Sequence, residues 1–337
     1  MTIRVTVGSA SAGALAGLQT ASARYAALQQ QMSTGNQITK PSDDPAGTVR
    51  ALELRGDLKR NAQYARSQAD ATGWLSVADT AYGQITDLVQ KVRTLTVQAS
   101  NTGASTGDSA KAIASEIASI REAIVKLANT SYNGQPVFGG TTIYGQTGGP
   151  GAPFELVTPV AGDPDFDPAD PTAQRVRYLG DAGVVNRTIG DQNKVQINQT
   201  GQTALGRPDD AVAAGPGNKD LFSLLDDLVA NLRSGGNPAN STTGDFHELA
   251  DPLKAIDANL TKLTAARAQS GAALARVEAA QTAAATDKIS IKSNLSQIQD
   301  IDLAEVAIQM NTAQVVYQAA LQTTANVRQL SLLNYLQ

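Results

Sequence analysis

The chain has 337 residues with 27 Lys and Arg against 31 Asp and Glu, which gives a formal net charge of −4. It contains no cysteine and one histidine, His247, and this excludes disulfide frameworks, thiolate metal sites, cysteine nucleophiles and multi-histidine metal sites. Without Lys/Arg clusters or an apolar run of about 18 residues, we expect neither nucleic acid binding nor membrane insertion, and the N-terminus lacks the pattern of a cleaved signal peptide.

Aromatic residues make up only 4 % of the chain, whereas Ala, Gln, Ser and Thr abound. A packed enzyme core usually contains more large side chains. The composition therefore favours long helices with alanine-rich contacts, and we expect no enzymatic activity and no cofactor.

The N-terminal segment, residues 1–44, is predicted to form a helix after a short β-like stretch over residues 2–7. Its apolar residues recur at alternating spacings of three and four, which is typical of a narrow helical stripe: Leu18, Ala21, Tyr25, Leu28 and Met32. We predict that this arm is helical in an assembly and disordered in the monomer.

Asp44 followed by Pro45 predicts the N-cap and first residue of the next helix. No further proline occurs before Pro136, and two long helices fit into residues 45–133, the N-terminal half of a rod. The stripe in the first of them is continuous: Trp74, Ala78, Ala81, Ile85, Leu88, Val92, Leu95 and Ala99.

Residues 134–219 are rich in Gly, Pro and Asp, and two alternating runs, 175–179 and 194–200, predict strands of a small inserted β domain. An acidic run in this segment has spacing similar to that of calcium loops, but prolines interrupt it and the sharp-turn glycine is missing: Asp163, Asp165, Asp167 and Asp170. We therefore expect no metal site.

Residues 220–299 return to helix and supply the C-terminal half of the rod, with heptad spacing from Leu253 onward. The heptad phase slips near residues 300–302, which predicts a stutter that locally alters the winding. Residues 300–337 form a C-terminal assembly helix with a second thin stripe: Leu303, Val306, Met310, Ala313, Tyr317 and Ala320.

The two ends share one weakness, a shortage of large apolar side chains. Fixing the backbone costs about 1–2 kcal/mol per residue, while a fully buried large apolar side chain returns about 1.5–3 kcal/mol. An isolated helix of this kind is marginal in water. We predict that the ends order by packing against each other and against neighbouring subunits, and that the eleven stripe residues form the assembly interface.

Three parts of the N-terminal third carry a recognisable pattern: Gln31-Met32-Ser33-Thr34-Gly35-Asn36, Lys40-Pro41-Ser42-Asp43-Asp44-Pro45, and the stretch from Asn61 through Trp74 to Asn101. With these motifs, the sequence resembles the flagellin superfamily over both helical thirds. The second of these motifs, with residues 133–141 and the terminal Leu330-Ser331-Leu332-Leu333-Asn334-Tyr335-Leu336, is more similar to the hook-filament junction proteins that adjoin the filament than to flagellin itself.

The resemblance implies a mainly α fold: a long antiparallel helical rod or coiled-coil bundle formed by both ends, with a small inserted β-rich domain. It implies an adaptor that is exported by the flagellar type III apparatus without signal-peptide cleavage and acts outside the cell. The expected partners are copies of itself in a ring, the first hook-filament junction protein, flagellin, and an export chaperone at the C-terminal region.

Three other functions remain open on the sequence. The nearest alternative is a filament-forming flagellin, which shares most of the pattern. A soluble coiled-coil signalling protein also has long Ala/Gln-rich heptads, although about 85 residues rich in Pro and Gly interrupt them here. An enzyme or binding module in residues 134–219 is the third, and nothing in the sequence requires it.

Overall fold

The computed structural model describes residues 7–101, 107–142, 151–158, 160–161, 174–206, 220–233 and 250–335. The chain forms two compact units, one of residues 63–284 and one that joins residues 1–62 to residues 285–337. Long helices dominate both units and a small set of strands lies in the first, so the predicted mainly α fold with a β-containing insert is confirmed.

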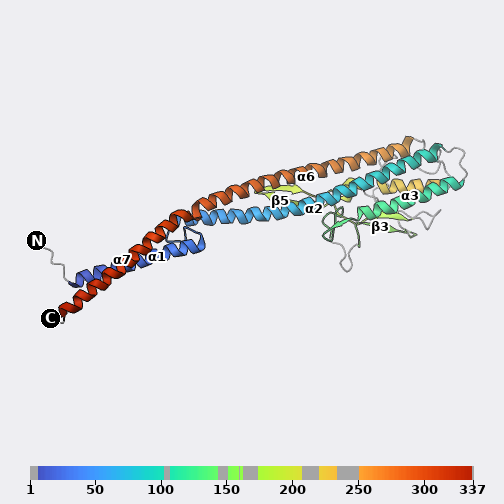
Figure 1. Ribbon diagram of the computed structural model, residues 1–337. Helices are drawn as coiled ribbons and strands as arrows, with labels where there is room; N and C mark the ends of the chain where they lie inside the picture. Colours follow the sequence, from blue (N-terminus) through green and yellow to red (C-terminus); the bar gives the residue numbers. More distant parts are fainter. Residues whose placement is uncertain are drawn as a thin grey trace. The chain divides into compact units, whose positions relative to one another are not determined.

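The rod of residues 63–284 contains most of α2 (Pro45–Asn101), α3 (Gly107–Ala128), α5 (Leu221–Arg233) and most of α6 (Ala250–Gln299). Helices α2 and α6 lie side by side (Figure 1) and are joined by Arg93–Asp257 and Arg267–Asp79 ion pairs of 2.8 and 2.7 Å. Since the residue numbers rise along α2 as they fall along α6, the two helices are antiparallel.

The rod core follows the predicted stripe of α2 closely. Trp74, Tyr82 and Ile85 are at most 2 % exposed, and they belong to one cluster with the apolar faces of α3 and α5. Helix α3 has apolar residues at 3,4 spacing, from Ile113 to Ile124, and packs against α5. Trp74 thus packs inside the core of the rod.

The strands form three antiparallel pairs: β1 (Ser131–Tyr132) with β2 (Gln135–Pro136), β3 (Phe154–Val157) with β4 (Arg175–Tyr178), and β5 (Asn186–Gly190) with β6 (Asn193–Gln196). Strands β4 and β6 overlap the two predicted runs, whereas β1, β2, β3 and β5 were not predicted. Strands β1 and β2 have two residues each, β3 ends in two consecutive apolar residues, and β5 contains a single large apolar residue, so none of them shows a regular alternation of apolar and polar residues.

The strand pairs are attached to the rod by aromatic side chains and by hydrogen bonds. The rings of Phe154 and Phe222 lie 5.1 Å apart between centroids, as do those of Tyr82 and Phe138. The Gln68 side chain donates to the Ile189 carbonyl at 2.6 Å. Short helix α4 (Gly201–Leu205) begins at the Thr200 cap and buries Leu205 in the same core.

The second unit contains α1 (Val7–Thr34), the start of α2, the end of α6 and α7 (Leu303–Tyr335). Val7, the last residue of the predicted β-like stretch, is helical, and residues 1–6 lie outside the described residues. Helices α1 and α7 lie side by side (Figure 1), which brings the two ends of the chain together.

The prediction of a coiled-coil stutter at residues 300–302 is wrong, because the helix ends there. Helix α6 stops at Gln299, and Asp302 begins α7 by accepting the backbone N–H groups of Ala304 and Glu305 at 2.9 and 3.2 Å. An aspartate at this position favours a new N-cap over continued helix, since its carboxylate satisfies N–H groups that would otherwise lack partners.

Candidate assembly surface

Helices α1 and α7 contact each other along a narrow apolar seam. Its buried members are Leu28, Val306 and Ala313, with Tyr25, Met32, Ile301 and Met310 packed around them as half-buried neighbours. Side chains spaced three and four apart lie on one face of each helix, and this is why the two thin stripes meet over several turns. The seam is therefore an intramolecular contact between the two ends of one chain.

Two further interactions hold the seam together. The rings of Tyr25 and Tyr317 stack with their centroids 6.2 Å apart and their planes 6° from parallel. The Thr324 hydroxyl lies 3.4 Å from the Ala14 carbonyl of the opposite helix, and also donates to Ala320 in its own helix at 2.7 Å. Both residues of the tyrosine pair are thus used within the chain.

Ten of the eleven residues predicted to form the interface are buried or half-buried on α1 and α7. The buried ones are Ala21, Leu28, Val306 and Ala313, and the half-buried ones are Leu18, Tyr25, Met32, Met310, Tyr317 and Ala320. Leu303 is different, because it lies at the start of α7 with 61 % of its surface exposed. Contact of these residues with another subunit remains a prediction.

Sequence reasoning missed a second apolar face on α7, which we call the outer face: Ile308 and Val315. These side chains are 68 and 65 % exposed. At 100° per residue, Ile308 and Val315 lie on the side of α7 opposite to Val306 and Ala313. The seven-residue spacing of Ile308 and Val315 is the signal that could have revealed this face.

Exposed large apolar side chains gather in the unit that contains both chain ends. Of the eleven such side chains among the described residues, nine belong to this unit: Leu15, Val49, Leu52, Ile289, Leu303, Ile308, Val315, Val316 and Leu321. Single exposed apolar residues are ordinary on protein surfaces, but a concentration of them marks an interaction site.

Two loops of this unit, which we call the paired loops, are joined to each other: residues 35–44 between α1 and α2, and residues 300–302 between α6 and α7. The backbone N–H of Gln37 donates to Gln299 at 2.6 Å, and that of Ile301 donates to Gly35 at 3.2 Å. Gly35 has φ +70°, a left-handed conformation that ends α1 and that side-chain-bearing residues rarely adopt.

The start of α2 is defined by two neighbouring aspartates. Asp44 accepts the backbone N–H of Gly47 at 2.9 Å, which is N-cap geometry with Pro45 as the first helical residue. Asp43 instead accepts the N–H of Lys40 at 2.9 Å and the hydroxyl of Thr39 at 3.0 Å. These hydrogen bonds, that from Lys40 above all, hold the pKa of Asp43 below its ordinary value.

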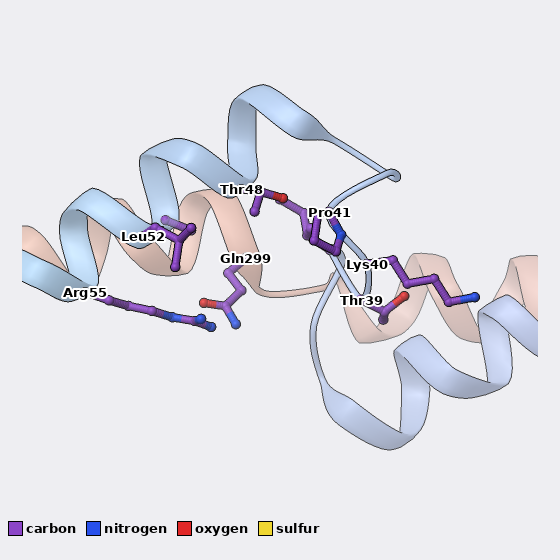
Figure 2. Close-up of a pocket in the computed structure, with 9 residues that line it drawn as sticks. Thr39, Lys40, Pro41, Thr48, Leu52, Arg55 and Gln299 are labelled. Carbon is purple, nitrogen blue, oxygen red and sulfur yellow. The ribbon is translucent and has the colours of Figure 1, made fainter.

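A pocket of about 260 Å³ lies beside the paired loops (Figure 2) and is lined by Ile38, Thr39, Lys40, Pro41, Thr48, Ala51, Leu52, Arg55 and Gln299. We call it the loop pocket. Its lining combines apolar side chains with two cationic ones, Lys40 and Arg55. Every lining residue belongs to the unit of the chain ends.

Among the described residues, no group of three or more His, Cys, Asp or Glu side chains could hold a metal ion. His247 and the acidic run Asp163, Asp165, Asp167 and Asp170 lie outside the described residues. In the same described ranges, no helix is long and apolar enough to cross a membrane.

Two family models match the chain. The bacterial flagellin N-terminal helical region matches residues 7–142, and the bacterial flagellin C-terminal helical region matches residues 253–336. Together the two matches span more than half of the chain and include both α1 and α7.

Curated relatives match nearly the whole length. Flagellar hook-associated protein 3 of Salmonella typhimurium is 24 % identical over 331 residues, which cover 94 % of this chain and 95 % of that protein. The protein of the same name in Escherichia coli is 24 % identical and covers 90 and 91 %. Flagellin of Bacillus subtilis is 25 % identical over 308 residues, covering 89 and 88 %.

Solved structures share the fold. A flagellar hook-associated protein from Vibrio parahaemolyticus aligns with a TM-score of 0.59 at 18 % identity, over 77 % of this chain and all of that one. Hook-associated protein 3 of Legionella pneumophila aligns with a TM-score of 0.55 at 14 % identity, over 73 and 98 %. With both helical regions matched in sequence, this chain belongs to the bacterial flagellin superfamily, and it is similar along nearly its whole length to hook-associated protein 3.

Proposed function

We propose that this chain is a structural component of the bacterial flagellum, an adaptor at the hook-filament junction that assembles through its terminal helices. The observation that carries the proposal is the pair α1–α7: one apolar face of α7 packs against α1 while Ile308 and Val315, on the opposite side, stay exposed. A helix with apolar residues on two opposite sides is suited to packing between neighbours.

The relatives supply the biological setting of this proposal. Proteins named flagellar hook-associated protein 3 match the chain nearly end to end, and we assign no enzymatic role because the named relatives are flagellar components. We further propose that the partners are copies of the chain in a ring, the first hook-filament junction protein and flagellin. Head-to-tail contacts between identical subunits generate such rings or open helices.

Export is the remaining part of the proposal. A chain whose two ends are thinly packed can pass an export channel unfolded and order on arrival, since little buried surface has to be broken. We propose secretion by the flagellar type III apparatus without signal-peptide cleavage, an extracellular position in the flagellum, and an export chaperone that binds the C-terminal region.

Met310→Asp tests the role of the α7 seam. A carboxylate placed against Leu28 and Val306 would be buried without a cationic partner, so α7 should no longer hold its place in the assembly. We expect the variant to be secreted but absent from the hook tip, with loss of filaments and motility. Met310→Leu is the control and should assemble normally, because it keeps the apolar volume.

Normal filaments and motility in the Met310→Asp strain would contradict the assembly role of the seam. Circular dichroism of the purified variant should show the rod helices intact. Rod unfolding would explain a loss of assembly without involving the interface, so the two measurements are needed together.

A filament-forming flagellin remains the second candidate, favoured by the match to Bacillus subtilis flagellin over 88 % of its length. Purified chain offered to isolated hooks that carry the first junction protein separates the two functions. An adaptor should add a limited number of copies and stop, whereas a flagellin should elongate into long filaments.

A further inference from the structure

The loop pocket is large enough to receive side chains of another protein segment. Its volume of about 260 Å³ is below the ~300–1,000 Å³ of most small-molecule sites, but it is enough for one or two side chains. It lies on the same unit as most of the exposed large apolar residues.

The chemistry of the pocket favours an occupant that is both apolar and acidic. Ile38, Ala51 and Leu52 supply apolar surface, and Leu52 is left 60 % exposed. Figure 2 shows Leu52 and Arg55 projecting from the same stretch of α2, near the Gln299 side chain. Among the described residues Arg55 makes no ion pair, so its guanidinium is available to a carboxylate.

The walls of the pocket are held in place before any partner arrives. The Gln299 amide donates to the Asn36 side chain at 2.9 Å. Ile38 packs closely against Gly47, because a Cβ added to this glycine would come within 2.8 Å of the Ile38 Cδ1 atom. A preformed site loses less conformational entropy when it binds, and this favours a specific contact over an incidental one.

We propose that the loop pocket receives the first turns of α7 from a second copy of this chain, with Ile308 against Leu52 and Glu305 paired with Arg55. Glu305 and Ile308 are three residues apart on a helix and therefore project to neighbouring positions. Ile308 is 68 % exposed, and Glu305 is exposed, with a hydrogen bond from Gln309 at 2.9 Å as its side-chain contact.

In this pairing, the apolar Leu52 and the cationic Arg55 of one copy contact the apolar Ile308 and the anionic Glu305 of the next copy. The donor and the acceptor are different surfaces of the same chain, so the contact is head-to-tail and repeats around a ring. The inference rests on the proposed function, because it takes the partner to be another copy of the chain in the flagellar assembly.

Disulfide cross-linking tests the contact directly, since the natural chain has no cysteine to interfere. Full-length Leu52→Cys and Ile308→Cys chains, each with a distinct tag, are produced together in flagellated cells that lack the native copy. We expect a disulfide-linked dimer that carries both tags in purified flagella. Ile289→Cys replaces Ile308→Cys in the matched control; Ile289 is 70 % exposed but lies on α6, and it should give at least ten-fold less dimer.

The outcomes separate this inference from the proposed function. Both tagged chains present in flagella without a cross-link above the Ile289→Cys control would overturn the loop pocket contact and leave the adaptor role intact. A Leu52→Cys cross-link to a protein of different size would also overturn it, because the occupant would then be another partner. Absence of both chains from flagella that form normally would contradict the proposed function itself.

Charge exchange provides an independent test. Arg55→Glu and Glu305→Arg should each reduce incorporation into flagella at least ten-fold, because each places like charges at the contact. The double variant should restore most of the loss. Circular dichroism of each purified single variant excludes misfolding, and a double variant no better than either single one would contradict the pairing.

Discussion

The rod and the unit of the chain ends bury their apolar surface to very different degrees. In the rod, α2, α3, α5 and α6 enclose large side chains completely, and Trp74, Tyr82 and Phe222 are at most 2 % exposed. In the other unit, the α1–α7 seam has Leu28, Val306 and Ala313 as its buried members, each 6–8 % exposed.

This difference in burial indicates that the rod is stable by itself and that the unit of the chain ends is only marginally stable. A rod with a filled core can hold its shape alone, whereas a two-helix seam returns little free energy for the backbone entropy it costs. Additional helices packed against the exposed apolar residues of α7 would bury them, and this would supply the buried apolar surface that one chain lacks. From this comparison we expect that neighbouring subunits complete the packing of the chain ends.

Phe222→Ala should give the largest effect, because it opens a cavity in the filled core beside Phe154. We expect the rod to lose about 3–5 kcal/mol of unfolding free energy. The only tryptophan, Trp74, lies in this core, so its fluorescence during guanidinium unfolding measures the loss. Phe222→Leu is the matched control and should lose clearly less; equal losses would contradict a closely packed site.

Leu28→Ala should have a smaller effect, confined to the seam. We expect a local loss of about 2 kcal/mol, equivalent to roughly 30-fold faster amide hydrogen exchange in α1 and α7. Even in the unaltered monomer, α1 and α7 should exchange faster than α2 and α3. The Trp74 unfolding midpoint should stay unchanged. Monomer helices α1 and α7 as strongly protected as the rod would contradict the comparison.

Asp43→Asn should give the smallest effect, limited to the paired loops. The pKa of Asp43 is lowered chiefly by the hydrogen bond from the Lys40 N–H, so its contribution is complete above the ordinary value of 3.8 and is lost as the pH falls through and below it. We expect the Lys40 amide resonance to shift in acid in the unaltered chain. In Asp43→Asn this acid shift should be absent, and its persistence would exclude Asp43 as the titrating group.

Periodicity alone predicted most of the helical fold. The continuous 3,4 spacing from Trp74 to Ala99 predicted a long buried helix face, and Asp44 followed by Pro45 predicted where α2 begins. The division of the chain at residues 44, 133, 219 and 299 stays a prediction, as does the disorder of the ends in the monomer. Strands β3 and β5 were not predicted because neither alternates apolar and polar residues as β4 does: β3 ends in two apolar residues and β5 has a single large one.

The candidate site was predictable only in part. The stripes of the two ends were visible in sequence, and the structure pairs them with each other. The outer face of α7 and the loop pocket were not visible, for different reasons. Ile308 and Val315 are separated by polar residues that weaken their pattern, and the pocket joins Arg55 of α2 to Gln299 of α6, which are far apart in the chain.

The sequence by itself determined the helices, the apolar stripe of each and the family motifs around Lys40–Pro45, because these depend on residues within a few turns of one another. Only the tertiary structure decided that Tyr25 stacks on Tyr317 and that a pocket forms beside the paired loops. Such contacts join residues more than 200 positions apart, and they depend on how whole helices pack, which no local pattern of side chains encodes.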